Sequence, residues 1–373
     1  MKVIINKKEV LKSFTNMQSI VERNNIIPIL SSLLMDAKEG RLFLYATNLK
    51  ISLIDECSAV IEKEGTIALD AKRVYEIIKE APNDEIVLEE KENTWVKISS
   101  GKIVYNLPGN NPQEYPERIK IKEKDPSIIM APKLLEMVRK TAFAIAEDEG
   151  KGSIGALFWE IMDGEKKKLR LVATDAHRLS CIEREKGDKE QFKGDLHAIL
   201  VPKKGVMELR KLLEDAGDEI IKIWKENENL LVKRDNTVLA IRLMEGEFPD
   251  YKKVLSFKGA HKIKLNTTAL LDVLRRVSIV LEERLRIIKA TLSAGVIRIV
   301  AHNSETGEAQ EEMGVDYQGD EKEINLNLRY LWDSLNCLND ETFFLEMKGP
   351  TEPIRILPEK DADHVLIVMP MVF

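Results

Sequence analysis

The chain has 373 residues, of which 32% are charged and 44% hydrophobic, and its formal net charge at pH 7 is −6. No apolar run approaches the roughly 20 residues of a membrane-spanning helix, and the N-terminus shows no signal-peptide pattern, so we expect a cytoplasmic protein without a membrane partner. The three cysteines lie far apart and form no CxxC pair, which favours free thiols over disulfides or zinc ligands. The histidines do not cluster, so we expect neither metal nor cofactor.

The predicted elements recur in the same order three times along the chain. Each copy starts with an amphipathic helix, whose apolar residues recur at intervals of three and four, followed by two alternating apolar strands joined by a turn. A second charged helix follows, and a short apolar strand closed by proline ends the copy. The segments that we assign to helices are 7–21, 71–81, 133–146, 203–215, 267–281 and 327–338.

The end of the predicted hairpin sets the length of the repeat. It reads Ala46-Thr47, Ala173-Thr174 and Ala301-His302 in the three copies, at nearly equal spacing. A repeat of this length is the size of an ordinary domain and can bury its own core, so the copies are domains and not the short turns of a solenoid. The predicted domains are 1–126, 127–254 and 255–373, and the predicted closing strands end at Tyr115-Pro116, Phe248-Pro249 and Met369-Pro370.

Charge is unevenly distributed between helices and the rest of the chain. The six helical segments contain 16 Lys or Arg residues against 9 Asp or Glu, although the whole chain is acidic. A protein with basic helices can hold a phosphate backbone there while its other surfaces repel it. The same pattern also fits cations that only cover solvated helix faces, and charge alone does not separate these readings.

Four short motifs carry a family resemblance. They are Ile27-Pro28-Ile29-Leu30 and the segments 173–180 (ATDAHRLS), 246–255 (GEFPDYKKVL) and 368–371 (VMPM). Together, in this order, they resemble the bacterial replicative sliding clamp, the beta subunit of DNA polymerase III. The resemblance covers the whole chain, including its threefold repeat.

The resemblance implies an α+β fold of three structurally equivalent domains, the DNA-clamp fold, each with two helices packed on antiparallel sheets. It also implies a head-to-tail homodimer that closes into a ring with pseudo-sixfold symmetry, helices around the hole and sheets outside. Duplex DNA would pass through the hole and be retained by closure, because attraction of phosphates by Lys and Arg is independent of sequence and permits sliding. The predicted DNA-facing cations are Lys7, Lys12, Arg23, Lys72, Arg73, Lys133, Arg139, Lys140, Lys203, Lys204, Arg210, Lys211, Arg275 and Arg276.

The family also has a peptide pocket that docks the catalytic subunit of the replicative polymerase, the clamp loader, other polymerases and repair proteins through short linear motifs. By resemblance this pocket comprises Thr174, Ala176, His177, Leu179, Pro249, Val254, Val368, Met369, Pro370 and Met371. Methionine suits a site with many partners, because its unbranched side chain can repack. Two departures bear on peptide preference: Ala176 replaces the usual glycine, and Val372-Phe373 replaces the common Arg-Leu ending.

Ring closure requires the first domain of one protomer to meet the third domain of another. The resemblance assigns this joint to strand 102–105 and to the helix end 278–281. The predicted interface residues are Val104, Ile279 and Val280, with neighbouring charges such as Glu282, Glu283 and Arg284 fixing the register.

An enzyme and a peptide-binding scaffold are the two other classes of function that the residues suggest. Asp175, His177 and Ser180 offer an acid, an imidazole and a hydroxyl, but they lie on one strand end, whereas nucleophilic catalysis needs groups that converge from separate elements. No glycine-rich phosphate loop follows a strand, so we expect no enzyme and no catalytic residue. The alternative is a peptide-binding scaffold without a DNA role, because the pocket argument does not depend on DNA.

Overall fold

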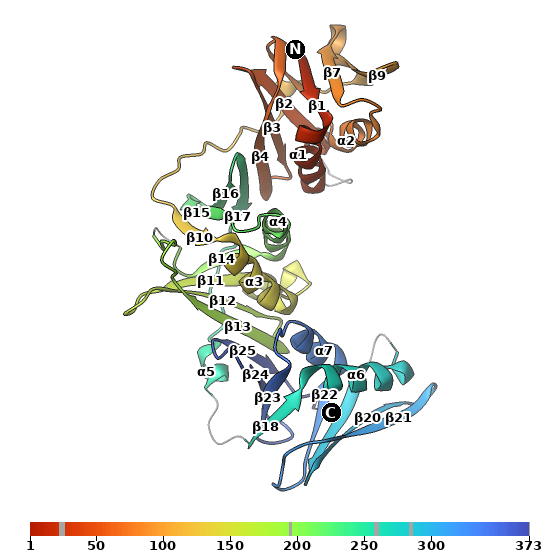
Figure 1. Ribbon diagram of the computed structural model, residues 1–373, viewed down its shortest axis with the longest axis vertical. Helices are drawn as coiled ribbons and strands as arrows, with labels where there is room; N and C mark the ends of the chain where they lie inside the picture. The colour runs from red at the N-terminus through yellow and green to blue at the C-terminus, as the bar shows by residue number, and fades with distance from the viewer. Residues whose placement is uncertain (22–26, 194–195, 257–260, 283–285, 373) are drawn as a thin grey trace. The chain divides into compact units, whose positions relative to one another are not determined.

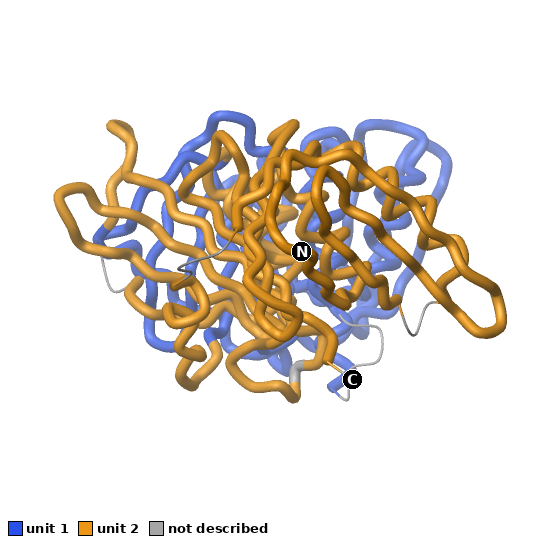
Figure 2. Tube along the Cα trace, turned by 90° about the horizontal axis from the view of Figure 1, so that it is seen from below, with its two compact units in different colours: residues 1–131, 193–195, 215–243 blue, residues 132–192, 196–214, 244–373 orange. Residues whose placement is uncertain are grey.

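The computed structural model (Figure 1) describes residues 1–21, 27–193, 196–256, 261–282 and 286–372. The chain divides into two compact units, which Figure 2 shows in separate colours. Unit 1 comprises Met1–Ala131, Lys193–Asp195 and Asp215–Leu243, and unit 2 comprises Pro132–Phe192, Leu196–Glu214 and Met244–Phe373.

One order of elements occurs three times in the described residues: strand, helix, four strands, helix, three strands. The first repeat, which has one additional strand (β5), comprises β1 (Lys2–Asn6), α1 (Lys7–Ile20), β2 (Ser32–Lys38), β3 (Arg41–Thr47), β4 (Ile51–Ser58), β5 (Val60–Lys63), β6 (Gly65–Asp70), α2 (Ala71–Glu80), β7 (Glu85–Glu90), β8 (Trp95–Ser100) and β9 (Ile103–Pro108). The second comprises β10 (Ser127–Met130), α3 (Ala131–Thr141), β11 (Ala156–Met162), β12 (Lys168–Thr174), β13 (Arg178–Glu185), β14 (Ile199–Pro202), α4 (Lys203–Glu214), β15 (Ile220–Glu226), β16 (Asn229–Arg234) and β17 (Thr237–Arg242). The third follows the short helix α5 (Lys252–Leu255) and comprises β18 (His261–Asn266), α6 (Thr267–Val277), β19 (Ile287–Ser293), β20 (Val296–Asn303), β21 (Gly307–Gly314), β22 (Lys322–Asn327), α7 (Leu328–Asn336), β23 (Thr342–Met347), β24 (Ile354–Pro358) and β25 (His364–Val368).

Side-chain caps explain where four of the helices begin. Asn6, Asp70, Asn266 and Asn327 each precede a helix and accept hydrogen bonds from backbone N–H groups in its first turn. These N–H groups have no partner inside the helix, and an Asn or Asp side chain satisfies them. The predicted helical segments are confirmed to within a few residues, except that 133–146 begins at Ala131 and, like 267–281, ends earlier as a regular helix.

Each repeat contains two antiparallel sheets of four strands, apart from the extra β5, and sheets of neighbouring repeats are joined. In unit 1, β4 pairs with β17 and makes one eight-stranded sheet in the order β10-β15-β16-β17-β4-β3-β2-β6. In unit 2, β13 pairs with β25 and makes a second, β14-β11-β12-β13-β25-β24-β23-β18. The same two positions in the repeat are used at both joints: the third strand after the first helix and the last strand.

The predicted strands closed by proline are wrong for the first two repeats. β25 does end just before Met369-Pro370, but no strand occurs at 115–116 or 248–249. Proline lacks the N–H that a ladder needs, and Pro112 and Pro116 flank this part of the chain. Tyr115 is instead anchored by its hydroxyl, which donates to the backbone oxygen of Ser32 at 2.9 Å. The predicted boundary at 254 falls within α5, and both domain boundaries stay a prediction.

Apolar faces hold the helices on the sheets, as the third repeat shows. Leu270 and Leu274 of α6 and Leu331 and Leu335 of α7 are buried in one cluster that continues with strand residues such as Ile299. Burial of one such side chain contributes roughly 1.5 to 3 kcal/mol. The apolar face therefore fixes each helix and leaves its charged face outward.

A buried charge network lies between α3, β13 and the segment before β25 in unit 2. The Lys140 ammonium donates to Glu136 at 2.8 Å and to Asp361 at 2.7 Å, and Arg184 donates to the same two carboxylates. Burial raises the pKa of Asp361, but the hydrogen bonds from Arg184 and Lys140 outweigh it and hold that pKa below its usual value. The network ties the second repeat to the third.

His364 lies at the buried end of this network. Ser180 Oγ donates to the backbone oxygen of Lys140 at 2.6 Å, so its contact of 3.1 Å with His364 Nε2 requires the imidazole to donate. The other ring nitrogen, Nδ1, is buried and has no hydrogen-bond partner among the described residues. Burial, and then the nearby Lys140 charge, lower the pKa of His364 to about 3.

The low pKa of His364 predicts that the folded protein loses stability as the pH falls from 6.5 to 5. The unfolded chain takes up a proton near pH 6.5 that the folded protein does not accept, so stability falls as the pH drops below 6.5. The loss should approach about 1.4 kcal/mol per pH unit. We expect His364→Gln to remove this loss, as measured by urea unfolding between pH 7 and pH 5.

The matched control is His261→Gln, which changes an exposed histidine and should retain the wild-type pH dependence. Equal loss of stability in the wild type and in His364→Gln would show that His364 is not held neutral.

Candidate functional site

The turn between β12 and β13 is built by its own side chains. Thr174 Oγ1 accepts from the backbone N–H of Ala176 at 3.1 Å and donates to the backbone oxygen of Arg178 at 2.7 Å. Asp175 Oδ1 accepts from the backbone N–H groups of His177 and Arg178, both at 3.0 Å. These bonds leave Ala176 and His177 exposed at the tip of the turn.

The first repeat forms the same turn between β3 and β4. Thr47 Oγ1 contacts the backbone N–H of Leu49 at 3.0 Å and the backbone oxygen of Ile51 at 3.1 Å. Asn48 Oδ1 accepts from Lys50 and Ile51, at 3.1 and 2.8 Å. In the third repeat, Asn303 Oδ1 again accepts two backbone N–H groups, at 2.8 and 3.1 Å. The internal repeat thus extends to individual hydrogen bonds.

The backbone of Ala176 is strained. Its φ is +75°, in the left-handed region that favours glycine, and Leu49 at the matching position has φ +70°. We expect Ala176→Gly to stabilise the protein by about 0.5 to 1 kcal/mol, because removal of Cβ relieves the clash and outweighs the added freedom of the unfolded chain. Thermal unfolding measures the change.

Ala309→Gly serves as the control, because Ala309 is in β21 and has no positive φ. That variant should lose stability, since glycine weakens a strand. A gain in both variants, or in neither, would contradict the role assigned to strain.

Arg178 connects the turn to α7. Its guanidinium donates to Asp175 at 3.0 Å, to Asp333 of α7 at 2.5 Å and to the backbone oxygen of Phe143 at 2.9 Å. It also lies 4.8 Å from the ring centroid of Tyr330, on which the His177 imidazole stacks at 5.7 Å. The arginine is buried, so the exposed tip of the turn rests on a fixed base. Sequence reasoning included Arg178 in a motif but did not identify this role, or those of Tyr330 and Asp333.

The three predicted pocket segments come together in unit 2. Pairing of β13 with β25 sets Arg178 opposite Val368, and the Met369 N–H donates to the backbone oxygen of His177 at 2.8 Å. Leu179 belongs to an apolar cluster with Tyr251 and Ile367, against which Phe248 and Leu255 pack. The turn, the segment around α5 and the C-terminal segment therefore meet at the end of one sheet joint, β13 with β25 (Figure 1).

The predicted pocket residues differ in accessibility. Ala176, His177, Pro249 and Val254 are exposed. Met369, Pro370 and Met371 are half-buried. Thr174, Leu179 and Val368 are buried, and Val368 belongs to the core of the third repeat. The buried three can support a bound peptide from beneath, whereas the other seven reach solvent.

The grouping of Asp175, His177 and Ser180 does not form a catalytic triad. The Asp175 carboxylate is engaged by backbone N–H groups and by Arg178. Ser180 Oγ is buried and contacts Lys140 and His364 instead. The acid and the hydroxyl thus belong to separate hydrogen-bond networks.

Half of the predicted DNA-facing cations reach solvent beside a carboxylate. Those pairs are Lys12 with Asp215 (3.6 Å), Lys72 with Glu76 (3.6 Å), Arg139 with Glu214 (3.6 Å), Arg210 with Glu214 (2.9 Å), Lys211 with Glu208 (2.7 Å), Arg275 with Asp272 (3.7 Å) and Arg276 with Glu311 (2.5 Å). Exposed pairs of this kind contribute only about 0 to 1 kcal/mol, so a phosphate can replace the carboxylate at small cost. Arg73 and Lys204 are also exposed.

The remaining cations of that set are held more firmly. Lys7 and Lys203 donate to the backbone oxygens of Ala81 and Ile145. Lys133 pairs with the buried Glu190. Lys140 requires a correction: it is only 6% exposed and is bound to two carboxylates, so it cannot meet a DNA phosphate from this position. Arg23 lies outside the described residues.

The predicted interface residues lie at sheet margins. Val104 is on β9, the edge strand of the sheet β5-β1-β7-β8-β9, and its exposure is 48%. Ile279 and Val280 follow α6 in the 3₁₀ turn Ser278–Val280, beside β21, which is the edge of the sheet β21-β20-β19-β22. Ile279 is 81% exposed. Glu282 is also exposed, and Glu283 and Arg284 lie outside the described residues.

The described residues lack both membrane-spanning helices and metal-binding clusters. Among the described residues, no helix has the length and apolar character needed to cross a membrane. No group of three or more His, Cys, Asp or Glu side chains in the described ranges could hold a metal ion. Cys57 and Cys181 are buried free thiols, and Cys337 is a half-buried one.

Known proteins resemble this chain along its whole length. The beta sliding clamp of Caulobacter vibrioides (strain NA1000 / CB15N) is 29% identical over 374 residues, with all of both chains covered. The crystal structure of the sliding clamp of Bartonella birtlesii bound to griselimycin has a TM-score of 0.94 at 28% identity, and that of the Caulobacter crescentus clamp 0.93 at 29%, each with full coverage of both chains.

Family models cover almost every residue. The N-terminal, central and C-terminal domains of the DNA polymerase III beta subunit match residues 1–121, 129–250 and 252–372. The α+β fold of three domains, each with helices on antiparallel sheets, agrees with the predicted fold class. The chain therefore belongs to the DNA polymerase III beta subunit family, the bacterial beta sliding clamps, and serves the polymerase as a non-catalytic processivity factor.

Proposed function

We propose that two copies of this chain close head to tail into a ring around duplex DNA and tether the replicative polymerase, the clamp loader and other polymerases or repair proteins to it. The proposal of a ring rests on one observation: neighbouring repeats join by pairing the same two strands of the repeat, β4 with β17 and β13 with β25. We also propose domain boundaries near 126 and 254 and, because the DNA lies there, action in the cytoplasm.

The sheet joints follow one rule, and two strands in the joining positions have no partner in a neighbouring repeat. At both joints inside the chain, the third strand after the first helix of one repeat pairs with the last strand of the next, as β4 pairs with β17 and β13 with β25. Of the strands in these positions, β9 and β21 alone lie at a sheet edge in the described part of the chain. An exposed edge is a template for another strand. The rule therefore predicts that β21 of one copy pairs with β9 of a second.

The repeat also predicts the register of this joint. Leu53, Ser180 and Ala309 match one another, because each lies opposite the alanine of the repeated Ala-Thr or Ala-His pair in the preceding strand. Leu53 pairs with Leu239 across its joint, and β17 and β9 each follow a two-residue turn, which aligns Leu239 with Tyr105. We therefore expect Ala309 of one copy opposite Tyr105 of the other. Exposed Val104 and Ile279 would then be covered.

Contact with DNA is proposed for the cations that reach solvent on the helices. These are Lys12, Lys72, Arg73, Arg139, Lys204, Arg210, Lys211, Arg275 and Arg276. Because most of them already have an exposed carboxylate beside them, each exchange of partner costs little, and the duplex can slide.

Binding of linear motifs is proposed for the surface formed by His177, Tyr330, Met369, Pro370 and Met371. The backbone bond between Met369 and His177 and the stacking of His177 on Tyr330 support one continuous surface. Its methionines can repack around different apolar anchors, which suits several partners.

A cysteine pair tests the ring and its register together. Residues directly opposite in an antiparallel pair have Cα atoms about 4.5 to 5.5 Å apart, which a disulfide can span. The variant Tyr105→Cys with Ala309→Cys should give a covalently closed dimer on mild oxidation, as seen on a denaturing gel. When the reduced variant is first loaded on a nicked circular plasmid by the clamp loader and then oxidised, the cross-linked dimer should stay on the circle and leave once the plasmid is linearised, as gel filtration measures.

Asn106→Cys with Ala309→Cys is the matched control, because a shift of one residue turns the side chain to the opposite face of the sheet. Equal cross-linking of both pairs would refute the register. Equal retention on circular and linear DNA would refute the ring and leave the peptide-binding scaffold without a DNA role.

Met371→Asp tests the peptide surface. A charge placed where an apolar anchor docks should weaken binding of the polymerase's clamp-binding peptide at least tenfold, since one buried apolar side chain contributes roughly 1.5 to 3 kcal/mol. Isothermal titration calorimetry measures the affinity. Met207→Asp, at an exposed methionine of α4, should bind as the wild type does, and unchanged binding by Met371→Asp would remove the C-terminal segment from the site.

A further inference from the structure

We propose that the cavity between α3, α4 and α7 binds one backbone phosphate of the DNA, with Arg139 and Arg210 as its ligands and Glu214 as a competing carboxylate. The inference rests on the proposed function and deepens it, because it assigns one contact and the means by which that contact stays weak. The cavity lies within unit 2 and has a volume of about 570 Å³.

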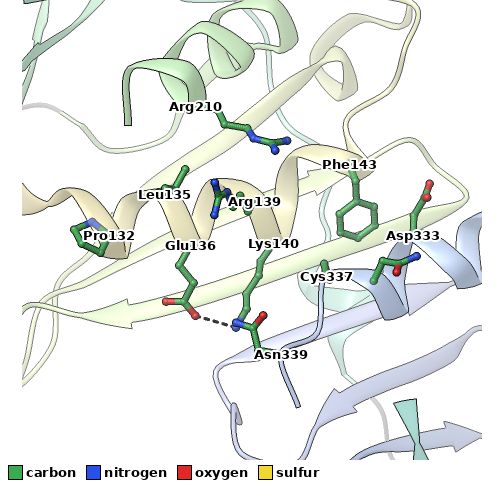
Figure 3. Close-up of a pocket in the computed structure, with 11 residues that line it drawn as sticks. Pro132, Leu135, Glu136, Arg139, Lys140, Phe143, Arg210, Asp333, Cys337 and Asn339 are labelled. Carbon is green, nitrogen blue, oxygen red and sulfur yellow. Dashed lines mark hydrogen bonds and ion pairs between the residues drawn. The ribbon is translucent and has the colours of Figure 1, made fainter. Parts of the chain in front are cut away.

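The walls of the cavity are of three kinds. Figure 3 shows Arg210 reaching from α4 toward α3, where Arg139 lies. Pro132, Leu135 and Phe143 form an apolar wall, and Asn336 and Asn339, both exposed, add neutral polar groups on the side of α7. Cations beside apolar and amide groups suit a sugar-phosphate backbone, in which a charged oxygen cluster adjoins an apolar sugar.

Most charges of the cavity are neutralised within the protein. Lys140 is bound by Glu136 and Asp361. The Asp333 carboxylate accepts from Arg178 at 2.5 Å. None of these groups can leave its partner cheaply, because each pair is at least partly buried.

Arg139 and Arg210 share a single carboxylate. Arg210 Nε donates to Glu214 Oε1 at 2.9 Å, whereas an Arg139 nitrogen lies 3.6 Å from the same oxygen, beyond hydrogen-bond distance. Two guanidinium groups that line the cavity and one carboxylate beside them leave one positive charge in excess. Guanidinium groups bind phosphate in bidentate geometry, so a phosphate can replace the shared carboxylate and gain better hydrogen bonds.

Glu214 makes the contact brief. A phosphate that enters must displace the Glu214 carboxylate from the two arginines. The carboxylate stays close, because Glu214 and Arg210 are on the same helix, and it competes with the phosphate for the guanidinium groups. The side chains of Arg139 and Glu214 are 52% and 37% exposed, so the exchange needs no repacking. A processivity factor must let DNA move, and a site with its own competing anion favours movement over capture.

Binding of a 20-base-pair duplex to the full-length protein tests the proposal, by fluorescence anisotropy at 50 to 200 mM KCl. We expect Arg139→Gln with Arg210→Gln to weaken binding about fivefold at 50 mM and to make the salt dependence less steep by about one phosphate contact. Glu214→Gln should strengthen binding about fivefold, because it removes the competitor.

Matched controls change the same charges elsewhere. Glu228→Gln releases the exposed Arg242, and Arg242→Gln with Arg298→Gln removes two exposed arginines outside the cavity. Both controls should stay within about twofold of the wild type. If each cavity variant matches its control, the effect is one of net charge and the proposal is wrong.

Retention of the wild type on circular DNA separates this inference from the proposed function. Retention together with cavity variants that behave like their controls overturns only the phosphate site, whereas loss from circular DNA overturns the ring. Inorganic phosphate and polyglutamate identify the ligand source in a thermal-shift assay. Stabilisation by either that depends on Arg139 and Arg210, without any effect of the variants on DNA binding, would assign the cavity to a free anion or an acidic peptide and overturn the proposal.

Discussion

The need to pair the edges of β-sheets governs the rest of this structure. Each repeat builds two small sheets, and each sheet ends in a strand whose N–H and C=O groups require partners. The chain meets this need by continuing a sheet of one repeat into a sheet of the next, through β4 with β17 and β13 with β25. The peptide surface lies at the second of these joints, and the proposed dimer pairs two of the remaining edges, β9 and β21.

The three repeats share a backbone but differ in the side chains that give function. The tip of the hairpin is set by the same Thr and Asx hydrogen bonds in the first two repeats and by Asn303 in the third. In the second repeat alone, this position is followed by Arg178, which holds the turn against α7. A common scaffold thus carries a specialised site in one copy, because a single buried guanidinium fixes what is elsewhere only a surface turn.

Patterns that are local in sequence predict the helices and hairpins well. Contacts between residues distant in sequence could not be predicted from such patterns. The helices and hairpins follow from apolar periodicity, and Asn6, Asp70, Asn266 and Asn327 mark helix starts. Nothing in the sequence near Lys140 indicates that it pairs with Asp361, so its charge and its place on a predicted helix favour the DNA face that the resemblance implies. The strands expected near Pro116 and Pro249 do not form. Proline allows an extended backbone, but it has no N–H to donate to a neighbouring strand. The pocket segments were found through the resemblance, whereas Tyr330 and Asp333 are single residues on a helix and carried no motif.

The shortness of the sheet joints has a mechanical consequence. β4 meets β17 over four residue pairs and β13 meets β25 over five, and inside the chain a covalent connection backs each of these seams. A seam of the same kind between two copies would have no such backing and would be the weakest point of the closed assembly. A protein that opens the assembly would therefore need to break only a few backbone hydrogen bonds at one joint. Every domain would remain folded while that joint is open.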